Sequence, residues 1–272
     1  TTWPGLGPVT STARVGEDRI VVASGRAQRV DLGYHARWED WATLRDGQSC
    51  SVADDGTSTR YACLASGLTP DSTRVAMGRI DRDGRLVDVT AEALALPGVA
   101  FEGVQLAYGA GAFALLWLDR DRGVWCAPLA PDGSVAAARA ARLDDGAPWP
   151  AYAPRHASLS FNGARFVAVW NADDRGHIVA ARLAPDATLL DATPRVVVSS
   201  PEYQPSFAAT SNAVGDTFVA WEGSNPVVGA WQVQGAVFHD DLAWPTADAG
   251  ADGGVEVGAD GGDAYVDAAR AN

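Results

Sequence analysis

The chain has 272 residues, a net charge of −13 and 47% hydrophobic residues, which is enough apolar material for one large domain or two small ones. Every basic residue is an arginine, and the arginines are spread along the chain without forming a basic cluster. Because nucleic acids and anionic membranes bind clustered cations, we expect neither as a partner. No uninterrupted apolar run is long enough for a membrane-spanning helix, so membrane insertion is not expected.

The start of the chain and its single methionine indicate a processed protein. The sequence begins Thr1-Thr-Trp-Pro, and its one methionine is Met77. We therefore expect a secreted or cell-surface protein from which a signal peptide has been removed. The acidic balance suits an exported protein that stays soluble.

Two of the three cysteines lie in stretches with the composition of neighbouring β-strands. Cys50 and Cys63 flank the turn Asp54-Asp-Gly56, so antiparallel pairing across this hairpin would bring them within disulfide range. A disulfide between them is expected, and it indicates an oxidising compartment. Cys126 lies in an apolar segment and is expected to be a buried thiol. Since the chain has no Cys-x-x-Cys motif and its four histidines are scattered, no metal site is predicted.

A segment that begins with an aromatic residue recurs every 52 or 53 residues. It reads Phe-Ala-Leu-Leu-Trp at 113–117, Phe-Val-Ala-Val-Trp at 166–170 and Phe-Val-Ala-Trp at 218–221. A copy without tryptophan, Tyr-Ala-Cys-Leu-Ala, stands at 61–65, and a weaker copy that lacks the first aromatic residue, Arg-Ile-Val-Val-Ala, stands at an irregular distance, at 19–23. These β-branched and aromatic runs predict one buried strand in each repeat.

The segments around this strand recur as well. A polar turn follows it at 119–123, 173–176 and 222–226. Another strand comes after the turn at 124–129, 178–183 and 227–233, and a further one precedes the aromatic strand at 104–108, 157–161 and 206–210. Each repeat therefore reads as about four short strands. Four-stranded units of roughly 50 residues suit the blades of a β-propeller, in which radial packing covers the faces of the sheets.

The sequence thus predicts an all-β protein, a β-propeller of five blades of about four strands, over residues 1–245. Four repeats are clear after about residue 50 and one irregular unit precedes them, with six blades as the alternative. Because an unclosed stack would expose both of its end faces, a closed ring is expected. The last unit lacks an obvious fourth strand, and the segment Val9–Val15 is a candidate to supply it and clasp the ring shut.

From Thr246 onward the composition changes abruptly to aspartate, alanine and glycine. Such a segment buries too little apolar surface to offset the entropy cost of ordering it, so residues 246–272 are predicted to be an acidic linker or tail. Its Asp-x-Gly-Gly pattern is similar to calcium-binding repeats, but the spacing is irregular. We therefore expect no cofactor, with calcium as the alternative.

The Phe/Tyr-(Val/Ala)-x-x-Trp strand, the acidic turn after it and the Pro-Asp-Gly turn at 131–133 resemble the propeller repeats of large secreted proteins of myxobacteria and their relatives. The Asp/Ala/Gly-rich end resembles the linkers that precede a cell-surface sorting segment in such proteins. The resemblance covers roughly residues 50–245 and the tail. It implies export and surface display, and it implies no catalytic residues.

Aromatic residues outside the repeat are the better ligand candidates. The repeated Trp117, Trp170 and Trp221 are expected between blades, because a large aromatic residue that recurs in successive units usually belongs to the core. Binding surfaces of repeat proteins usually lie in insertions specific to one unit. The predicted ligand-binding residues are irregular aromatic residues and polar residues near the expected channel mouth, namely Trp38, Trp41, Glu102, Trp149, Arg155, His156 and Tyr203.

The leading hypothesis is an exported, non-catalytic binding or scaffold domain whose loops on one face of the propeller contact a glycan or a protein. The alternative is a five-bladed-propeller glycoside hydrolase acting in the central funnel, which needs two carboxylates a few ångströms apart. The inner strands offer Glu102, and the first unit could add Asp31, Glu39 or Asp40. A structural subunit of an envelope or filament assembly is a third possibility. Since no Gly-x-Ser-x-Gly motif accompanies the histidines, no catalytic residue is predicted.

Overall fold

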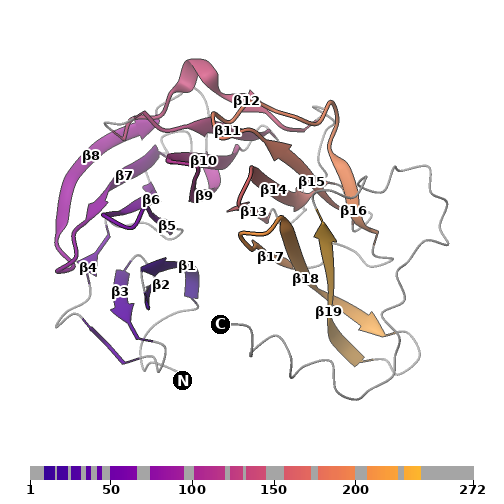
Figure 1. Cartoon of the computed structure of the whole chain (residues 1–272), viewed down its shortest axis with the longest axis horizontal. Coiled ribbons are helices and arrows are strands. Elements are labelled where there is room, and N and C mark those ends of the chain that lie inside the picture. Colours follow the sequence, from indigo (N-terminus) through magenta and orange to yellow (C-terminus); the bar gives the residue numbers. More distant parts are fainter. Residues whose placement is uncertain are drawn as a thin grey trace.

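The computed structural model describes residues 9–15, 17–23, 26–31, 35–37, 42–44, 50–65, 74–94, 101–119, 123–130, 133–144, 156–172, 177–199, 207–225 and 230–239. Its strands form five antiparallel sheets that follow one another around a common axis like the blades of a propeller (Figure 1). The predicted all-β, five-bladed fold is confirmed. The predicted tail at 246–272 lies outside the described residues. No helix in the described ranges is long and apolar enough to cross a bilayer.

Each blade pairs its strands in chain order, from the axis outward. Blade 1 consists of β1 (Val9–Val15), β2 (Asp18–Ala23), β3 (Arg26–Val30) and β4 (Ala42–Thr43). Blade 2 consists of β5 (Cys50–Asp54), β6 (Thr59–Ala65), β7 (Arg74–Ile80) and β8 (Leu86–Leu94). Blade 3 consists of β9 (Phe101–Gly109), β10 (Ala112–Asp119), β11 (Val124–Pro128) and β12 (Ala141–Arg142), with the short 3-10 helix η2 (Ala137–Arg139) before β12. Blade 4 consists of β13 (Ala157–Phe161), β14 (Phe166–Asn171), β15 (His177–Leu183) and β16 (Arg195–Ser199). Blade 5 consists of β17 (Phe207–Ser211), β18 (Asp216–Asn225) and β19 (Ala230–His239).

The first strand of each blade lies nearest the axis and contacts the first strand of the next blade. β1 contacts β5, β5 contacts β9, β9 contacts β13, and β13 contacts β17. No comparably extensive contact joins β17 to β1 among the described elements, and the blades follow an open arc (Figure 1). The described strands therefore do not form the closed ring that we expected from the repeats.

The strand β1 belongs to blade 1 and does not complete blade 5. It pairs with β2 along its length, with Ala13 opposite Ile20 and Arg14 opposite Arg19. The expected clasp by Val9–Val15 is therefore wrong. A hairpin across a short turn closes at little entropic cost, whereas a partner some two hundred residues away requires a much larger loop to close. Blade 5 has three strands within the described residues.

The second strand of a blade fills the two neighbouring interfaces, because its side chains alternate between the two faces of the sheet. In β10, Phe113 and Trp117 pack into the core between blades 2 and 3. Leu116 points the other way, into the core between blades 3 and 4, which also holds Phe166 and Trp170. Trp117 and Trp170 are each 1% exposed. The prediction that the repeated aromatic residues form the core is confirmed for these positions.

Phe218 departs from the repeat. It lies three residues before Trp221, whereas Phe113 and Phe166 lie four residues before their tryptophans. Because side chains alternate along a strand, the odd spacing places Phe218 and Trp221 on opposite faces of β18. Trp221 packs toward blade 4, and the buried Thr217 takes the position that matches Phe113. Phe218 itself is 44% exposed, so its predicted equivalence with the other two phenylalanines is wrong.

Serine hydroxyls link the inner strands of consecutive blades. The linked pairs are Ser11 Oγ with the Val52 N–H (3.2 Å), Ser51 Oγ with the Leu106 N–H (2.9 Å) and Ser160 Oγ with Ser211 Oγ (2.7 Å). An inner strand has only one partner in its own sheet, so its other edge would otherwise present unpaired backbone groups. In the first two pairs the serine hydroxyl accepts a hydrogen bond from such a backbone N–H, and all three links hold one blade against the next.

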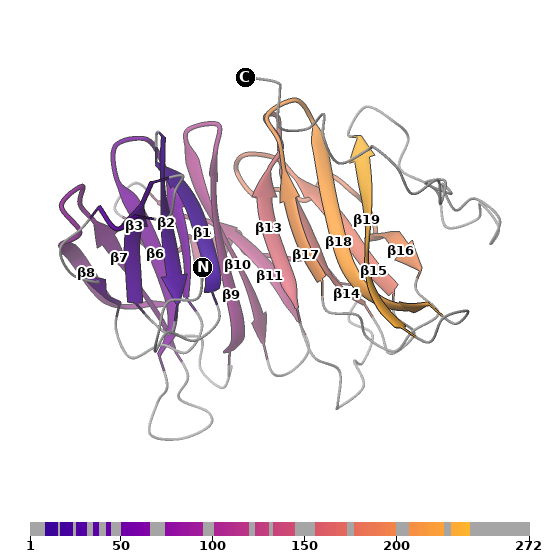
Figure 2. The ribbon, with the colours of Figure 1, turned by 90° about the horizontal axis from the view of Figure 1, so that it is seen from below.

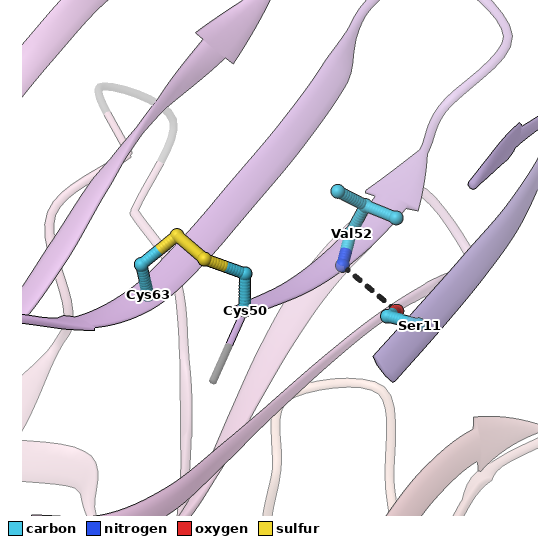
Figure 3. Close-up of a disulfide and its surroundings, with 4 residues drawn as sticks. All are labelled: Ser11, Cys50, Val52 and Cys63. Carbon is cyan, nitrogen blue, oxygen red and sulfur yellow. Dashed lines mark hydrogen bonds between the residues drawn. A yellow bond between two sulfur atoms is a disulfide. The ribbon is translucent and has the colours of Figure 1, made fainter. Parts of the chain in front are cut away.

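The predicted disulfide between Cys50 and Cys63 is confirmed (Figure 3). The two residues lie directly opposite each other in β5 and β6, with their Cα atoms 4.1 Å apart. Both are buried in the core between blades 1 and 2. Cys126 is a buried free thiol, as expected, and burial raises its pKa to about 12 against a smaller opposing effect of a backbone hydrogen bond.

We expect the cysteines to differ sharply in reactivity toward a thiol reagent such as DTNB at about pH 8. The native protein should show no reactive thiol, because Cys126 is buried and protonated at this pH and the other two cysteines are oxidised. Unfolding in guanidinium should expose one thiol, and reduction in guanidinium should expose three. Rapid reaction of the native protein would contradict the buried position of Cys126.

An ion pair inside blade 4 ties β15 to the segment before β16. Arg182 Nη2 donates to Asp191 Oδ1 at 2.7 Å, and the Arg182 backbone N–H donates to Asp191 Oδ2 at 2.7 Å. The side chain of Asp191 is 2% exposed. Burial raises the pKa of Asp191, but the hydrogen bonds from Arg182 and the charges of Arg182 and Arg195 outweigh burial and lower this pKa overall.

Replacing Asp191 by asparagine should lower the free energy of unfolding by about 2–3 kcal/mol at neutral pH, because it leaves a partly buried arginine without its counterion. Since the pKa of Asp191 is lower in the folded than in the unfolded chain, its stabilising effect is complete above the unfolded pKa near 4 and disappears as the pH falls through the folded pKa. The difference in Tm between the unmodified protein and Asp191→Asn should therefore shrink below about pH 4. Asp83→Asn, at an exposed position of the turn between β7 and β8, is the control and should change the Tm little at either pH. A Tm difference that is unchanged near pH 2 would refute the assignment.

Blade 3 meets blade 4 closely at Gly109, the last residue of β9. A Cβ atom at this position would lie 2.0 Å from Cγ of Phe161, the ring atom bonded to Cβ. Any residue larger than glycine must therefore move the whole Phe161 ring. That ring also meets the Phe166 ring edge to face, with centroids 5.2 Å apart, and so has little freedom to move. At Gly103 of the same strand, an added Cβ would lie 3.6 Å from Leu118 Cδ1, which is an ordinary contact.

The substitution Gly109→Ala should therefore lower the free energy of unfolding by about 1–3 kcal/mol through overpacking of the interface between blades 3 and 4. Gly103→Ala is the matched control and should change stability by less than about 1 kcal/mol. Urea denaturation followed by tryptophan fluorescence measures both. Equal losses in the two variants would mean that the close approach at Gly109 does not limit packing.

Candidate functional site

The two ends of the propeller are built differently. At one end, which we call the turn end, short turns join the first two strands of the blades, with positive-φ glycines at 56, 111, 163 and 215. Figure 2 shows the turns β9–β10 and β17–β18 on this same side. At the opposite end, the loop end, the inner strands β5, β9, β13 and β17 begin. The chain therefore enters blades 2 to 5 at the loop end, whereas connections between third and fourth strands, such as residues 184–194 in blade 4, lie at the turn end.

Two of the seven residues predicted to bind a ligand lie in the described part of the chain, and both are at the loop end. Glu102 lies on β9, and His156 directly precedes β13. The remaining five, Trp38, Trp41, Trp149, Arg155 and Tyr203, lie outside the described residues.

A β-bulge sets the position of Glu102. Leu118 of β10 pairs with Gly103, but the next residue, Asp119, pairs with Phe101. Glu102 is therefore the extra residue of the inner strand and has no partner of its own in β10. Bulges bend a strand and redirect its side chains, and they are frequent beside active sites. The irregularity places Glu102 at a special backbone position at the mouth of the axis.

Asp119 stands opposite Phe101 at the same end. Its carboxylate stabilises the hairpin formed by β10 and β11. Oδ1 accepts a hydrogen bond from the Gly123 N–H at 2.7 Å, and Oδ2 accepts one from Trp125 Nε1–H at 2.8 Å. The Trp125 indole in turn stacks on Trp117, with ring centroids 6.3 Å apart and planes 8° from parallel. Asp119 is 7% exposed. Both of its carboxylate oxygens therefore serve the turn between β10 and β11.

His156 is exposed at the junction of blades 4 and 5. Its backbone N–H donates to Asn171 Oδ1 at 3.3 Å, and its imidazole meets the ring of Phe207 edge to face, with centroids 6.5 Å apart. Phe207 is the half-buried first residue of β17. The pair presents an aromatic surface and a ring nitrogen side by side, which can stack against a polar ligand and hydrogen-bond to it.

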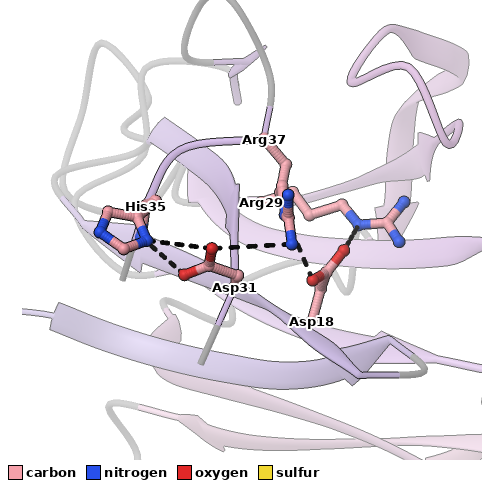
Figure 4. Close-up of polar contacts among 5 residues, drawn as sticks. All are labelled: Asp18, Arg29, Asp31, His35 and Arg37. Atoms are coloured by element: carbon pink, nitrogen blue, oxygen red, sulfur yellow. Dashed lines mark hydrogen bonds and ion pairs between the residues drawn. The ribbon is translucent and has the colours of Figure 1, made fainter. Parts of the chain in front are cut away.

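A connected group of charges lies at the turn end of blade 1 (Figure 4). Arg29 Nε donates to Asp18 Oδ2 at 2.8 Å, and Arg37 lies 3.5 Å from Asp18 Oδ1 and 3.6 Å from Asp31 Oδ2. His35 Nδ1 lies 3.0 Å from Asp31 Oδ2. Nothing in the repeat pattern pointed to this network, because its members come from β2, β3 and the segment after β3. Its geometry fastens that segment to the β2–β3 hairpin.

The network also bears on the hydrolase alternative. Asp31, which the sequence offered as a partner for Glu102, lies at the turn end and is engaged by His35 and Arg37, so the two do not share a site. Glu39 and Asp40 lie outside the described residues. Within the described ranges, no group of three or more histidine, cysteine, aspartate or glutamate residues is arranged to hold a metal ion.

No protein family and no curated protein matches this chain. Solved structures do resemble it in fold. A protein of unknown function from Dyadobacter fermentans superposes with a TM-score of 0.55 at 12% identity over 81% of this chain and 65% of its own. The GH43_1 enzyme of Xanthomonas citri, in complex with xylose, gives 0.53 at 12% identity over 90% of this chain and 91% of its own.

A third structure is the α-L-arabinofuranosidase of Lactobacillus brevis, with a TM-score of 0.52 at 12% identity over 85% of this chain and 91% of its own. The two enzymes are five-bladed propellers. At this level of identity the likeness concerns the fold alone, and it agrees with the blade count deduced from the repeats.

Proposed function

We propose that this protein is an exported, non-catalytic binding domain that holds a glycan at the loop end of the propeller. The observation that carries the proposal is the asymmetry between the two ends. At the turn end, short turns join the first two strands of the blades, while the chain enters each of blades 2 to 5 at the loop end. Binding residues of repeat proteins lie on such irregular segments, which a rigid scaffold holds in place.

His156 and Phe207 form the described part of the proposed site. Sugars are recognised through apolar ring faces and dense hydroxyl groups, which suit an aromatic surface next to a ring nitrogen. Trp149, Arg155 and Tyr203 precede β13 and β17 in the chain and lie outside the described residues, so they remain predicted members of the site. Trp38 and Trp41 belong to the connection that leaves β3 at the turn end, and we leave them out of it.

Export is supported by the buried disulfide, since such bonds persist in oxidising compartments and are rare in the cytosol. The resemblance to secreted propeller proteins, with the Asp/Ala/Gly-rich segment as a linker to the cell surface, fits the same location. The proposal therefore places the domain outside the cytosol, where glycans of the cell's surroundings are available.

A glycoside hydrolase acting at the axis is the second candidate function. The bulge at Glu102 favours it, because the bulge gives a carboxylate-bearing residue a special backbone position at the mouth of the axis. Hydrolysis of a glycosidic bond needs a second carboxylate about 5–10 Å from the first. Asp119, which is near in the sheet, is committed to Gly123 and Trp125. We therefore rank hydrolysis below binding.

A glycan array probed with the purified chain tests the proposal. We expect a restricted set of glycans to bind, and His156→Ala to weaken binding about tenfold, equivalent to about 1.4 kcal/mol. His35→Ala, at an exposed histidine of the turn end, is the matched control and should bind as the unmodified protein does. Equal weakening by the two substitutions, or none by either, would refute a site at the loop end.

The remaining outcomes separate the alternatives. A uniformly blank array with a folded protein would reject a glycan ligand and point to a protein partner. Release of aryl alcohol from chromogenic glycosides that is lost in Glu102→Gln would replace binding by hydrolysis.

A further inference from the structure

One tryptophan of the repeat is only partly covered by its neighbouring blade. Trp117 and Trp170 are each 1% exposed, whereas Trp221 is half-buried. Trp221 lies on the face of β18 that meets blade 4, and it packs against the core between these two blades. Part of its indole is therefore accessible between blades 4 and 5, where it can contribute apolar contact area to a ligand.

The inner-strand residue beside this tryptophan is specific to blade 5. In blade 3 the partner of the repeated tryptophan is Val104, and in blade 4 it is Ala157. In blade 5 the partner of Trp221 is Phe207. Because directly paired residues of an antiparallel sheet place their side chains next to each other on one face, blade 5 has two adjacent aromatic residues at the loop end.

Blade 4 departs from the repeat at the same place. The residue that follows the repeated tryptophan is Leu118 in blade 3, where it is buried in the core, but Asn171 in blade 4. Asn171 Oδ1 accepts a hydrogen bond from the His156 N–H at 3.3 Å, and the Asn171 N–H donates to the His156 carbonyl at 3.3 Å. An amide in place of leucine thus holds the backbone of His156, whose imidazole meets the Phe207 ring.

The β18–β19 hairpin extends beyond β17 at this end. β17 begins at Phe207, the partner of Trp221. β18 continues past this pair, and its residues 222–225 pair with residues 230–233 of β19. Figure 2 shows both strands running past β17. In blade 4, by contrast, β14 ends one residue after its tryptophan. The extended hairpin therefore borders the two aromatic residues on their outer side.

These departures from the repeat all lie at the loop end of blades 4 and 5. A purely structural role would bury Phe207 as completely as its counterpart Val104, which is 1% exposed, but Phe207 is half-buried. Ligand contacts of repeat proteins concentrate where single units differ from the rest. The coincidence of an added aromatic residue, a fixed histidine backbone and an extended hairpin therefore indicates a built binding surface.

We propose that Trp221 and Phe207 contact the apolar face of a pyranose ring of the bound glycan, while the His156 imidazole hydrogen-bonds to its hydroxyl groups. This inference rests on the proposed function, and it adds Trp221 to the site and a ring-shaped sugar unit to the description of the ligand. Aromatic side chains bind such a ring through its apolar area. An acyclic polyol has the same hydroxyl groups but no such face, so the site should distinguish the two.

The glycan array, repeated with variants of the aromatic pair, tests the contact. Phe207→Val restores the residue that blade 3 has at this position, and Trp221→Leu retains apolar bulk, so both should remain folded as judged by Tm. Each should lower the signal of the bound glycans about tenfold. Phe218→Leu removes an exposed aromatic residue from the opposite face of β18 and is the matched control, which should bind as the unmodified protein does.

The outcomes separate this inference from the proposed function. If folded Phe207→Val binds as the unmodified chain does while His156→Ala loses binding, the aromatic contact is refuted and glycan binding at the loop end stands. The same result decides the question if Trp221→Leu does not fold. A blank array with the unmodified protein would refute both the contact and the proposed function.

Nuclear magnetic resonance provides an independent measurement of the ring contact. The indole N–H signal of Trp221, assigned by its loss in Trp221→Phe, is followed while the methyl pyranosides of glucose, galactose, mannose and xylose are added. At least one pyranoside should shift this signal, and sorbitol, an acyclic polyol, should not. No shift with any pyranoside, or an equal shift with sorbitol, would overturn the proposal.

Discussion

The structure depends on the need to cover both faces of each sheet. The second strands β10 and β14 are buried along nearly their whole length, so a blade in isolation would expose apolar surface on two sides. Such a sheet is stable only between two others, and the blades therefore stack in the order in which the chain supplies them. The Cys50–Cys63 disulfide joins two strands of blade 2 inside the core between blades 1 and 2. The serine links along the inner strands and the close approach at Gly109 act at the interfaces between blades. The burial weakens in blade 5, where Thr217 and Val219 are covered but Phe218 is not.

Radial stacking also determines where a ligand can bind. The faces of the blades are covered by neighbouring blades, so only the two ends of the axis and the outer rim are available to a ligand. At the turn end, short turns join the first two strands, and the charges on blade 1 are engaged in joining its own segments. The loop end collects the connections whose length and composition differ from blade to blade. His156 and Glu102 stand there because the inner strands begin there.

The likeness to sugar-processing enzymes concerns this scaffold and not its chemistry, since one fold supports many unrelated activities. What separates a binding domain from a hydrolase on the same scaffold is a pair of free carboxylates at the axis. In blade 3 the second carboxylate at hand, Asp119, is drawn into the β10–β11 turn by Gly123 and the Trp125 indole. The hydrogen bonds that stabilise the hairpin therefore occupy both oxygens of Asp119, which is then not available as a second catalytic carboxylate.

Local pattern was sufficient to predict the repeated strands, the number of blades and the Cys50–Cys63 pair. These features follow from alternation along a strand and from pairing across a hairpin, which are both local in the sequence. The placement of Phe218 shows the limit, because a one-residue change in spacing reverses the face of a side chain while the segment still looks like its relatives. The bulge at Glu102 and the charge network of Asp18, Arg29 and Asp31 were decided by tertiary structure alone. They depend on how strands meet and on which segments come together in space, and no spacing in the chain records either.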